Sequence, residues 1–326
     1  MKRRRALTLV GAVALFPAST LAQRTAVPFI GFLSAGSPHE RSHLVAAFRQ
    51  GLKESGFVDG KDVAIEYRWA ESHYERLRPL ADELAQRQVA VIVATGGQGS
   101  AVAAKAATST IPIVFTGGGD PIRLGLVASL SRPGGNVTGV MNVSNSLDAK
   151  RLEVLLDLVP KASTIAYLIN PDNVSIESSL KDVRSAAAAA RKQLRVFEAR
   201  TEKDFDAAFV AIKQGGAKAL LVGTDAVFIS HRDALVGLAA RHSLPASYNT
   251  REYAAAGGLV SYGANFSDVY RQAGIYTGRI LKGAKPAELP VRQPEKFELV
   301  LNLKTAKKLG LTVSRDFLTR VDEVIQ

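Results

Sequence analysis

Short apolar runs alternate along the chain with segments in which apolar residues recur every three or four positions. Between the runs the spacing is helical, as in Leu44, Phe48 and Leu52. Strands that are apolar throughout and alternate with amphipathic helices are typical of parallel sheets covered on both faces. The pattern therefore predicts an α/β fold. The apolar runs, rich in β-branched and aromatic residues, lie at 29–33, 63–67, 89–94, 111–115, 165–169, 219–222 and 259–262.

The order of these segments occurs twice. Residues 29–67 run strand, polar loop, helix, strand, and residues 165–197 do the same. Each unit continues with a strand that ends in threonine, then a helix and a further strand. Two βαβαβ units in the same order predict two similar lobes. The turn-rich stretch 132–139, followed by another short strand, is the expected link between them.

The C-terminal part is too short for a third lobe. It reads as a helix at 268–282, a segment with spaced prolines, a strand at 297–301 and a short helix at 305–309. These elements must add to the two existing lobes, so we expect the chain to cross between lobes more than once through a hinge of several strands. The expected boundaries are 28–140 plus 262–290 for lobe 1 and 141–261 plus 291–326 for lobe 2.

Residues 1–22 have the pattern of a signal peptide. Four basic residues, 2–5, precede a short apolar run, and the segment ends in the small-x-small sequence Thr20-Leu21-Ala22. The apolar run is too short for a permanent membrane helix. We therefore predict export with removal of the leader, by either the general or the twin-arginine route. The alternative is a buried N-terminal helix.

Composition and charge exclude several classes of protein. The 326 residues carry a formal charge of +12 and include no cysteine. Without cysteine there is no disulfide scaffold, cysteine nucleophile or lipid-anchored N-terminal cysteine. Loss of the leader leaves a charge near +8, but the remaining basic residues are interleaved with acids and not with aromatics. This distribution indicates a solvated mixed surface, so no nucleic-acid partner is expected.

Loops at the carboxyl ends of the strands are the candidate binding site, because ligands of open parallel sheets bind there. These loops are rich in small, hydroxylated and amide-bearing residues, and several precede a helix, whose free N–H groups attract anions. The alternative for each residue is a cap or turn. The candidates are Ser34, Thr95, Gly96, Gly97, Gly119 and Asp120 in the first lobe, and Asn170, Asn173, Asp225, Tyr248 and Tyr262 in the second.

We expect the two lobes to hold opposite ends of one ligand. Ser34 and the turn 95–97 offer hydroxyl and backbone N–H groups, so we predict that they hold a carboxylate. Asp225 ends an apolar strand facing the cleft, where a buried carboxylate needs a partner such as an ammonium group. The alternative is that Asp225 caps the helix that begins near Ile229.

The sequence contains only weak or partial matches to the motifs of enzymes. His39-Glu40-Arg41-Ser42-His43 matches the H-E-x-x-H zinc pattern, but it follows a turn and begins a helix whose predicted buried face is Leu44, Phe48 and Leu52. The alternative for it is a solvated first turn. Gly97-x-Gly99 is an incomplete dinucleotide fingerprint, and no G-x-S-x-G or Walker A sequence occurs. We therefore expect no catalytic residue, no metal and no cofactor.

Three long motifs stand out along the mature chain. They are Gly51-Leu52-x-Glu54-x-Gly56-Phe57-x-x-Gly60 through Val63-x-Ile65-Glu66-Tyr67-Arg68-Trp69-Ala70-Glu71, Ile111-Pro112-Ile113-Val114-Phe115 through Arg132-Pro133-Gly134-Gly135-Asn136, and Leu301-Asn302-Leu303-Lys304-Thr305. They resemble the ABC transporter substrate-binding family that includes tryptophan/phenylalanine-binding proteins, and the resemblance covers nearly the whole mature chain. One departure is Ser72-His73, where a glycine often follows the Ala-Glu pair.

The resemblance implies a periplasmic-binding-protein type I fold, with two Rossmann-like lobes and a three-strand hinge. It implies capture of a small solute between the lobes and delivery to an ABC permease in the inner membrane, and it suggests that Tyr248 and Tyr262 flank an apolar or aromatic ligand side chain. We expect a monomeric, non-enzymatic binder of an amino acid or related carboxylate, free in the periplasm. The alternatives are an exported enzyme using the same cleft and a binding protein that presents its ligand to a membrane sensor.

Overall fold

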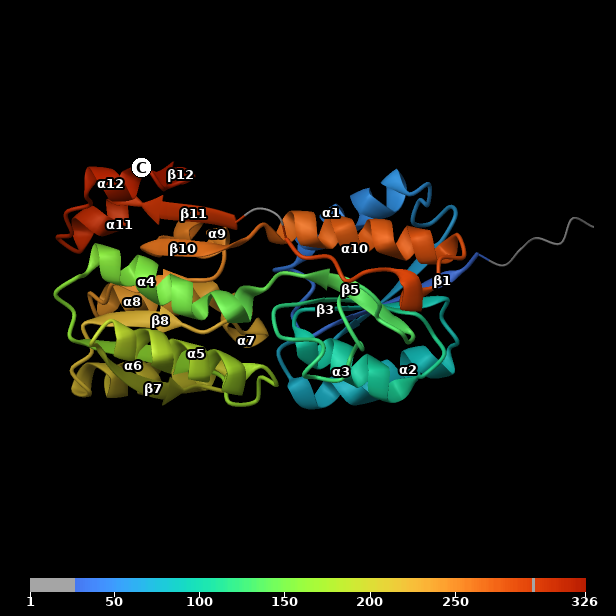
Figure 1. Ribbon diagram of the computed structural model, residues 1–326, viewed down its shortest axis with the longest axis horizontal. Coiled ribbons are helices and arrows are strands. Elements are labelled where there is room, and N and C mark those ends of the chain that lie inside the picture. The colour runs from blue at the N-terminus through green and yellow to red at the C-terminus, as the bar shows by residue number, and fades with distance from the viewer. Residues whose placement is uncertain (1–26, 295–296) are drawn as a thin grey trace, which may run out of the picture.

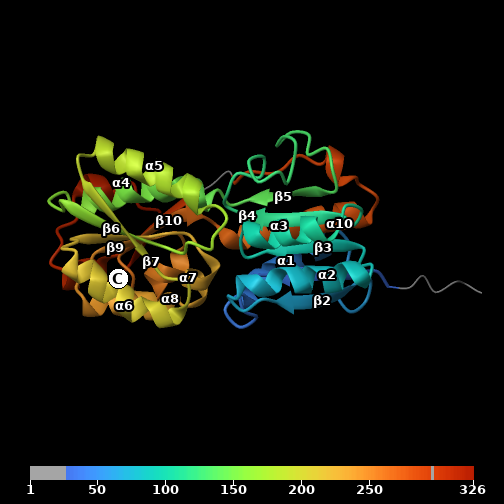
Figure 2. The same cartoon turned by 90° about the horizontal axis from the view of Figure 1, so that it is seen from below.

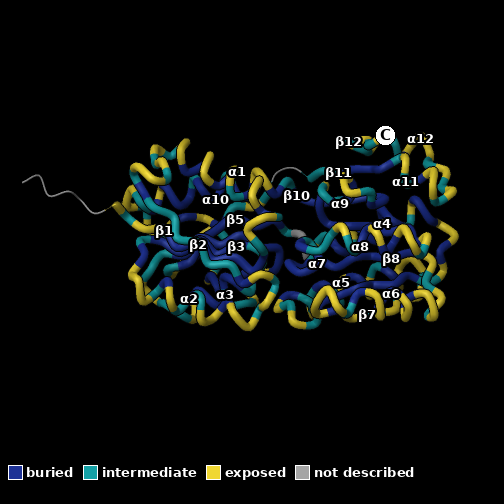
Figure 3. Tube along the Cα trace, turned by 180° about the vertical axis from the view of Figure 1, so that it is seen from behind, coloured by how far each residue is buried: buried dark blue, intermediate teal, exposed yellow. Residues whose placement is uncertain are grey.

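Two α/β lobes lie side by side along the long axis of the molecule (Figure 1). The computed structural model describes residues 27–294 and 297–326, so the expected leader at 1–22 lies outside the described residues. In each lobe a buried sheet is covered by helices on both faces (Figures 2 and 3). The predicted fold class is confirmed. Within the described ranges, no helix is both long and apolar enough to cross a membrane.

The first lobe is built on a five-stranded parallel sheet in the order β2-β1-β3-β4-β5. One face packs against α1 and α10, and the other against α2 and α3. Its elements are β1 Phe29–Ser34, α1 Ser42–Glu54, β2 Ala64–Trp69, the 3-10 turn η1 Tyr74–Arg76, α2 Leu77–Gln86, β3 Val91–Thr95, α3 Gln98–Ala107, β4 Ile113–Gly117, β5 Val137–Met141, α10 Phe266–Leu281 and η4 Pro286–Glu288.

The second lobe has a seven-stranded sheet in the order β12-β11-β10-β9-β8-β6-β7. Helices α4 and α5 cover one face of its central strands, and α6 and α8 cover the other. Its elements are η2 Ser144–Leu147, α4 Asp148–Leu158, β6 Thr164–Ile169, α5 Ile176–Ala189, β7 Gln193–Glu198, η3 Glu202–Asp204, α6 Phe205–Gln214, β8 Ala219–Val222, α7 Ala226–Ser230, α8 Arg232–Arg241, β9 Ala246–Tyr248, α9 Arg251–Ala255, β10 Val260–Ala264, β11 Phe297–Asn302, α11 Leu303–Lys308, α12 Arg315–Leu318 and β12 Glu323–Ile325.

The predicted internal repeat is present in the topology. The strand order β7-β6-β8-β9-β10 of the second sheet reproduces β2-β1-β3-β4-β5 of the first. The C-terminal strand β11 then adds antiparallel to β10, and β12 pairs parallel with β11. The tail therefore extends the second sheet. Without it, β10 would be an edge strand with unpaired backbone groups.

The chain passes between the lobes three times, as a hinge of several strands requires. It leaves the first lobe after β5, returns between β10 and α10, and leaves again between Arg292 and β11. The expected link at 132–139 lies inside the first lobe instead. The reason is that β5 pairs with β4, and Asn136 Nδ2 donates to the carbonyl of Ile111 at 2.8 Å.

Helix α10 docks on the first lobe through an unusually close approach to α1. A Cβ on Gly51 would collide with the carbonyl oxygen of Arg271, and one on Gly274 would collide with that of Phe48. Glycine at these two positions lets the two backbones touch. The chain can therefore return from the second lobe and still close the core of the first.

Candidate functional site

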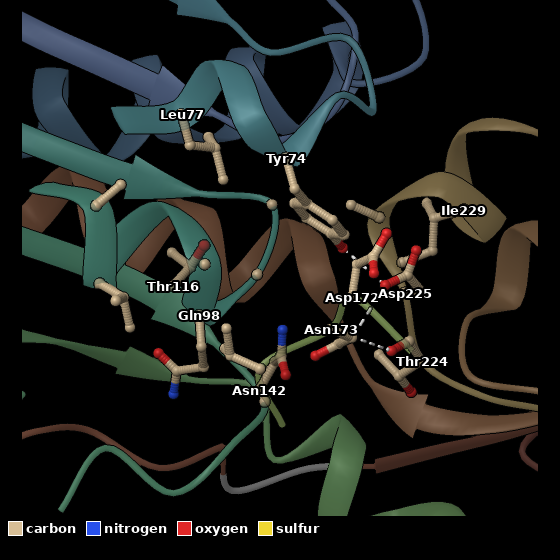
Figure 4. Close-up of a pocket in the computed structure, with 18 of the residues that line it drawn as sticks. Tyr74, Leu77, Gln98, Thr116, Asn142, Asp172, Asn173, Thr224, Asp225 and Ile229 are labelled. Atoms are coloured by element: carbon tan, nitrogen blue, oxygen red, sulfur yellow. Dashed lines mark hydrogen bonds between the residues drawn. The ribbon is translucent and has the colours of Figure 1, made fainter. Parts of the chain in front are cut away.

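A cavity of about 320 Å³ lies between the lobes, at the carboxyl ends of the strands (Figure 4). Parallel pairing places Ser34 beside Thr95, so the loops after β1 and β3 leave the sheet at the same edge. Both lobes line the cavity. Its apolar wall includes Leu77, Val102, Ala103, Ala106, Ile229 and Phe266.

Asp225 is the buried acid of this cavity. It follows β8 and caps α7, accepting from the Val227 N–H at 2.9 Å. Its carboxylate also accepts from Asn170 Nδ2 and Asn173 Nδ2, each at 3.0 Å, and from the Tyr74 hydroxyl at 2.7 Å. The alternative prediction of a cap is therefore confirmed, although the capped helix begins at Ala226 and not near Ile229. The cap is part of a larger network that faces the cavity.

Four donors fill the lone-pair sites of a carboxylate, of which there are about four. Burial raises the pKa of Asp225, although the hydrogen bonds from Tyr74, Asn170, Val227 and Asn173 each lower it. A ligand ammonium would therefore have to replace one of these donors. Only Tyr74 belongs to the opposite lobe, so Tyr74 is the donor that leaves when the lobes separate.

Tyr74 joins the two lobes. It lies in η1, directly before α2, and its ring packs against the cores of both lobes. Burial, followed by the charge of Asp225, raises its pKa well above the usual value, so the hydroxyl remains a donor. Ala226 of the second lobe also packs into a core cluster of the first. These contacts describe a closed arrangement of the lobes.

Replacing Tyr74 by phenylalanine should favour the open arrangement. A hydrogen bond to a charged group contributes about 1.5–3 kcal/mol, so the closed-to-open ratio should fall roughly tenfold to hundredfold. Small-angle scattering of the ligand-free variant should give a larger radius of gyration than the wild type. Tyr67→Phe is the matched control, because the Tyr67 hydroxyl accepts from Arg49 within one lobe. Equal radii for Tyr74→Phe and the wild type would show that the Tyr74–Asp225 hydrogen bond does not hold the lobes together.

Two of the six first-lobe candidates line the cavity. Gly96 and Gly97 do so, and their positive φ values of 82° and 128° let the chain turn from β3 into α3. Ser34 and Thr95 are buried beneath this turn, where Ser34 Oγ accepts from the Gly36 N–H and Thr95 Oγ1 donates to the Leu33 carbonyl.

The other two first-lobe candidates serve the loop after β4. The Gly119 carbonyl accepts from Gln98 Nε2 at 2.8 Å, and it is Gly118 that lines the cavity. Asp120 is exposed and its Oδ1 accepts from the N–H groups of Ile122 and Arg123. Its side chain is therefore a turn cap.

The structure brings three of the five second-lobe candidates together. Asp225 and Asn173 line the cavity, and Asn170 lies behind them, holding Asp225. Tyr248 and Tyr262 do not line it. Tyr248 stacks on Tyr253 in the core of the second lobe, with ring centroids 4.5 Å apart, and Tyr262 lies against Phe297. Side chains alternate along a strand, so a strand-end position does not by itself point a ring into the cleft.

Sequence reasoning missed Tyr74 and Arg41, both of which line the cavity. Tyr74 follows β2, and the strand-end rule applies to this loop as it does to the others. In the sequence, Arg41 is a variable position of the H-E-x-x-H match. It directly precedes α1, where the helix dipole disfavours a cation, and that unfavourable placement was a usable signal.

The H-E-x-x-H segment leads into α1, and its second histidine faces the other lobe. His43 lies in α1 and its Nε2 is 3.6 Å from Glu252 of the second lobe. The predicted buried face of α1, with Leu44, Phe48 and Leu52, is confirmed. Across the described part of the chain, no three His, Asp or Glu side chains are grouped closely enough to hold a metal ion.

Comparisons with known proteins agree with this architecture. A tyrosine-binding protein of Clostridioides difficile (strain R20291) is 26% identical over 264 residues, which are 81% of this chain and 75% of that protein. The structure of an ABC domain in complex with L-Trp from Streptococcus pneumoniae matches with a TM-score of 0.83 at 24% identity. The ligand-free, open structure of CD0873 from Clostridium difficile, a substrate-binding protein with adhesive properties, matches with a TM-score of 0.63, also at 24% identity.

Each of these two structures covers 92% of this chain and is itself covered completely. Both therefore show the same two-lobed fold as this chain. The model of the family described as ABC transporter substrate binding protein matches residues 36–325. These residues include both lobes and all three passages between them, and the chain therefore belongs to the ABC transporter substrate-binding protein family.

Proposed function

We propose that this protein is the extracytoplasmic solute-binding component of an ABC importer, and that it captures an amino acid or related small carboxylate between its lobes. The observation that carries the proposal is the cavity itself. Both lobes line it, one wall is apolar, and a buried carboxylate held by Asn170 and Asn173 stands at one side. Small-molecule sites have this composition, with few polar groups in an apolar setting.

The relatives support an amino acid as the ligand. One is named for tyrosine binding, and one was solved with L-Trp. In this chain Leu77, Val102 and Ala106 offer an apolar surface for a ligand side chain, and Asp225 offers a negative charge for an ammonium group. An aromatic or large aliphatic amino acid is the ligand class that satisfies both features.

The proposed setting is a periplasm. The leader pattern at 1–22 supports export. The partner we propose is an inner-membrane ABC permease, to which the closed protein delivers its ligand. We propose that the protein acts as a monomer, because one chain forms the complete cavity.

Titration calorimetry of the mature protein against the twenty amino acids and a set of simple carboxylates tests the proposal. We expect binding of at least one large apolar amino acid, with no change in the ligand when the mixture is analysed by mass spectrometry afterwards. Turnover of the ligand would favour the exported-enzyme alternative. If no compound binds, the proposed ligand class is wrong.

Ligand should also close the lobes further on average. A ligand that contacts both lobes binds the closed state more tightly and shifts the population towards it. Small-angle scattering should therefore show a smaller radius of gyration at saturating ligand than without ligand. The comparison is most sensitive in the Tyr74→Phe variant, whose ligand-free state is expected to be more open. An unchanged radius in that variant would contradict a hinged binder.

A further inference from the structure

Arg41 is a buried cation at the cavity with no acidic partner among the described residues. It lines the cavity, and it is only 2% exposed. Its Nη1 lies 3.4 Å from the Tyr270 hydroxyl. Its Nε and Nη2 are buried and have no hydrogen-bond partner in the described part of the chain.

Stability alone does not explain an arginine at this position. A guanidinium stays protonated in proteins, and burying a charge without a partner is strongly unfavourable. The residue also directly precedes α1, at the helix end where a cation is disfavoured. A bound anion removes both penalties at once, because it neutralises the charge and accepts the unused hydrogen bonds.

The two unpartnered nitrogens are the ones that suit a carboxylate. In a guanidinium, Nε–H and one Nη2–H point in the same direction and form a planar fork. This fork donates two parallel hydrogen bonds to the two oxygens of one carboxylate. Arg41 therefore presents an unused bidentate donor in a cavity that already has an acid, Asp225, in its opposite lobe.

Gly36 provides the space that the guanidinium occupies. A Cβ at Gly36 would collide with Nε of Arg41 and lie 2.8 Å from its Cδ and 2.9 Å from its Cζ. Any larger residue there would displace the side chain from its present position. The loop after β1 thus contributes to the site through a residue without a side chain. Ser34 lies behind this loop, where its Oγ accepts from the Gly36 N–H.

Asp225 is not the missing partner of Arg41. Its four acceptor positions are filled by Tyr74, Asn170, Asn173 and Val227. The positive and negative groups of the cavity are therefore held separately, one by each lobe. A ligand that carries both an anion and a cation can engage Arg41 directly, and Asp225 once its cation replaces the Tyr74 hydroxyl.

We propose that Arg41 binds the carboxylate of the ligand through Nε and Nη2, and that this contact makes a carboxylate a requirement for capture. The proposal rests on the proposed function, since it assigns one end of the same ligand. It places the carboxylate at Arg41, and not at the buried hydroxyls of Ser34 and Thr95.

The test is a cycle of protein and ligand changes measured by calorimetry. The probes are L-tryptophan, L-tryptophanamide, which lacks the carboxylate charge, and indole-3-propionate, which lacks the ammonium. Wild type should bind L-tryptophan at least tenfold more tightly than the amide. In Arg41→Met this preference should disappear, with the loss falling on the two carboxylates and not on the amide. Equal losses for acid and amide would overturn the proposal.

Three further variants separate a ligand contact from a structural role. Arg41→Lys keeps the charge but lacks the fork, so it should recover only part of the preference. Gly36→Ala should reproduce Arg41→Met. Arg320→Met is the matched control, because Arg320 is an exposed arginine that pairs with Asp157 away from the cavity; it should keep the preference.

A ligand-independent measurement keeps this proposal distinct from the proposed function. Without ligand, Arg41→Met should melt at the wild-type temperature or above, because an unpaired buried charge has been removed. Acetate should raise the melting temperature of the wild type relative to chloride at equal ionic strength, and not that of Arg41→Met. If no indole compound binds, tryptophan is not the ligand, and the acetate result still decides the role of Arg41. Equal responses of the two proteins to acetate would overturn the proposal.

Discussion

Asp225→Asn should lose amino-acid affinity roughly tenfold to hundredfold while retaining most of its stability. Asparagine caps a helix about as well as aspartate, so the hydrogen bond from the Val227 N–H can persist. The negative charge is lost, however, and a charge-assisted hydrogen bond contributes about 1.5–3 kcal/mol. Calorimetry and thermal melting on the same sample measure the two effects separately.

Asp225→Ala should lose both amino-acid affinity and stability. It removes the cap, which contributes about 1 kcal/mol, and it leaves the buried amide of Asn170 without its acceptor, which costs about 1–3 kcal/mol more. Ser314→Ala is the matched control, since Ser314 Oγ caps α12 at an exposed position away from the cavity. That variant should lose stability only. Wild-type affinity in Asp225→Asn would show that Asp225 is solely a cap.

The pH dependence of binding follows from the same residue. Burial raises the pKa of Asp225 in the free protein. An ammonium ligand favours the ionised form, so binding should release protons and affinity should rise as pH rises through that pKa. In Asp225→Asn this dependence should vanish. Stability has the opposite sign: because the folded pKa is above the unfolded one, the contribution of this group is greatest at low pH and decreases as pH rises.

Arg151→Met should lower the free energy of unfolding by about 3–5 kcal/mol, the cost of leaving a buried charge without its partner. Arg151 is completely buried and pairs with Asp148, which also accepts from the Tyr167 hydroxyl. Burial lowers the pKa of Arg151 to about 10, so it remains protonated at neutral pH. Urea unfolding of the ligand-free protein measures the loss.

Two comparisons isolate the cause. Arg320→Met removes an exposed ion pair with Asp157 and should cost less than about 1 kcal/mol. The double variant Arg151→Met with Asp148→Leu removes both buried charges and should recover much of the lost stability. A loss of less than 1 kcal/mol in Arg151→Met alone would contradict the assigned importance of this pair.

This buried pair also supports the site. Arg151 Nη2 donates to Thr224 Oγ1 at 2.8 Å, and Nη1 donates to the carbonyl of Tyr262 at 3.2 Å. Thr224 directly precedes Asp225, and Tyr262 lies in β10, the last strand before the chain passes to the first lobe. Arg151 therefore fixes the loop that carries Asp225 relative to one strand of the hinge.

The sequence by itself determined the architecture. Apolar runs at strand length and helical spacing between them are local properties, and each predicted strand is found within two residues of its expected ends. The repeat was equally visible, because the order of elements survives in the chain as it does in the two sheets. The strand-end rule also located the correct edge of the sheets and four of the residues that line the cavity: Gly96, Gly97, Asn173 and Asp225.

Tertiary structure alone decided which side chains at that edge face the cavity. Ser34 and Tyr248 lie at the ends of strands, and Asp225 lies shortly after one. Only Asp225 faces the cavity, because Ser34 is buried beneath the β3–α3 turn and Tyr248 packs into the core of the second lobe. The roles of Tyr74 and Arg41 depend on contacts between segments far apart in the chain, such as Tyr74 with Asp225. Local pattern fixes the elements because it acts over a few residues, whereas a site between two lobes is made by long-range packing that no local pattern records.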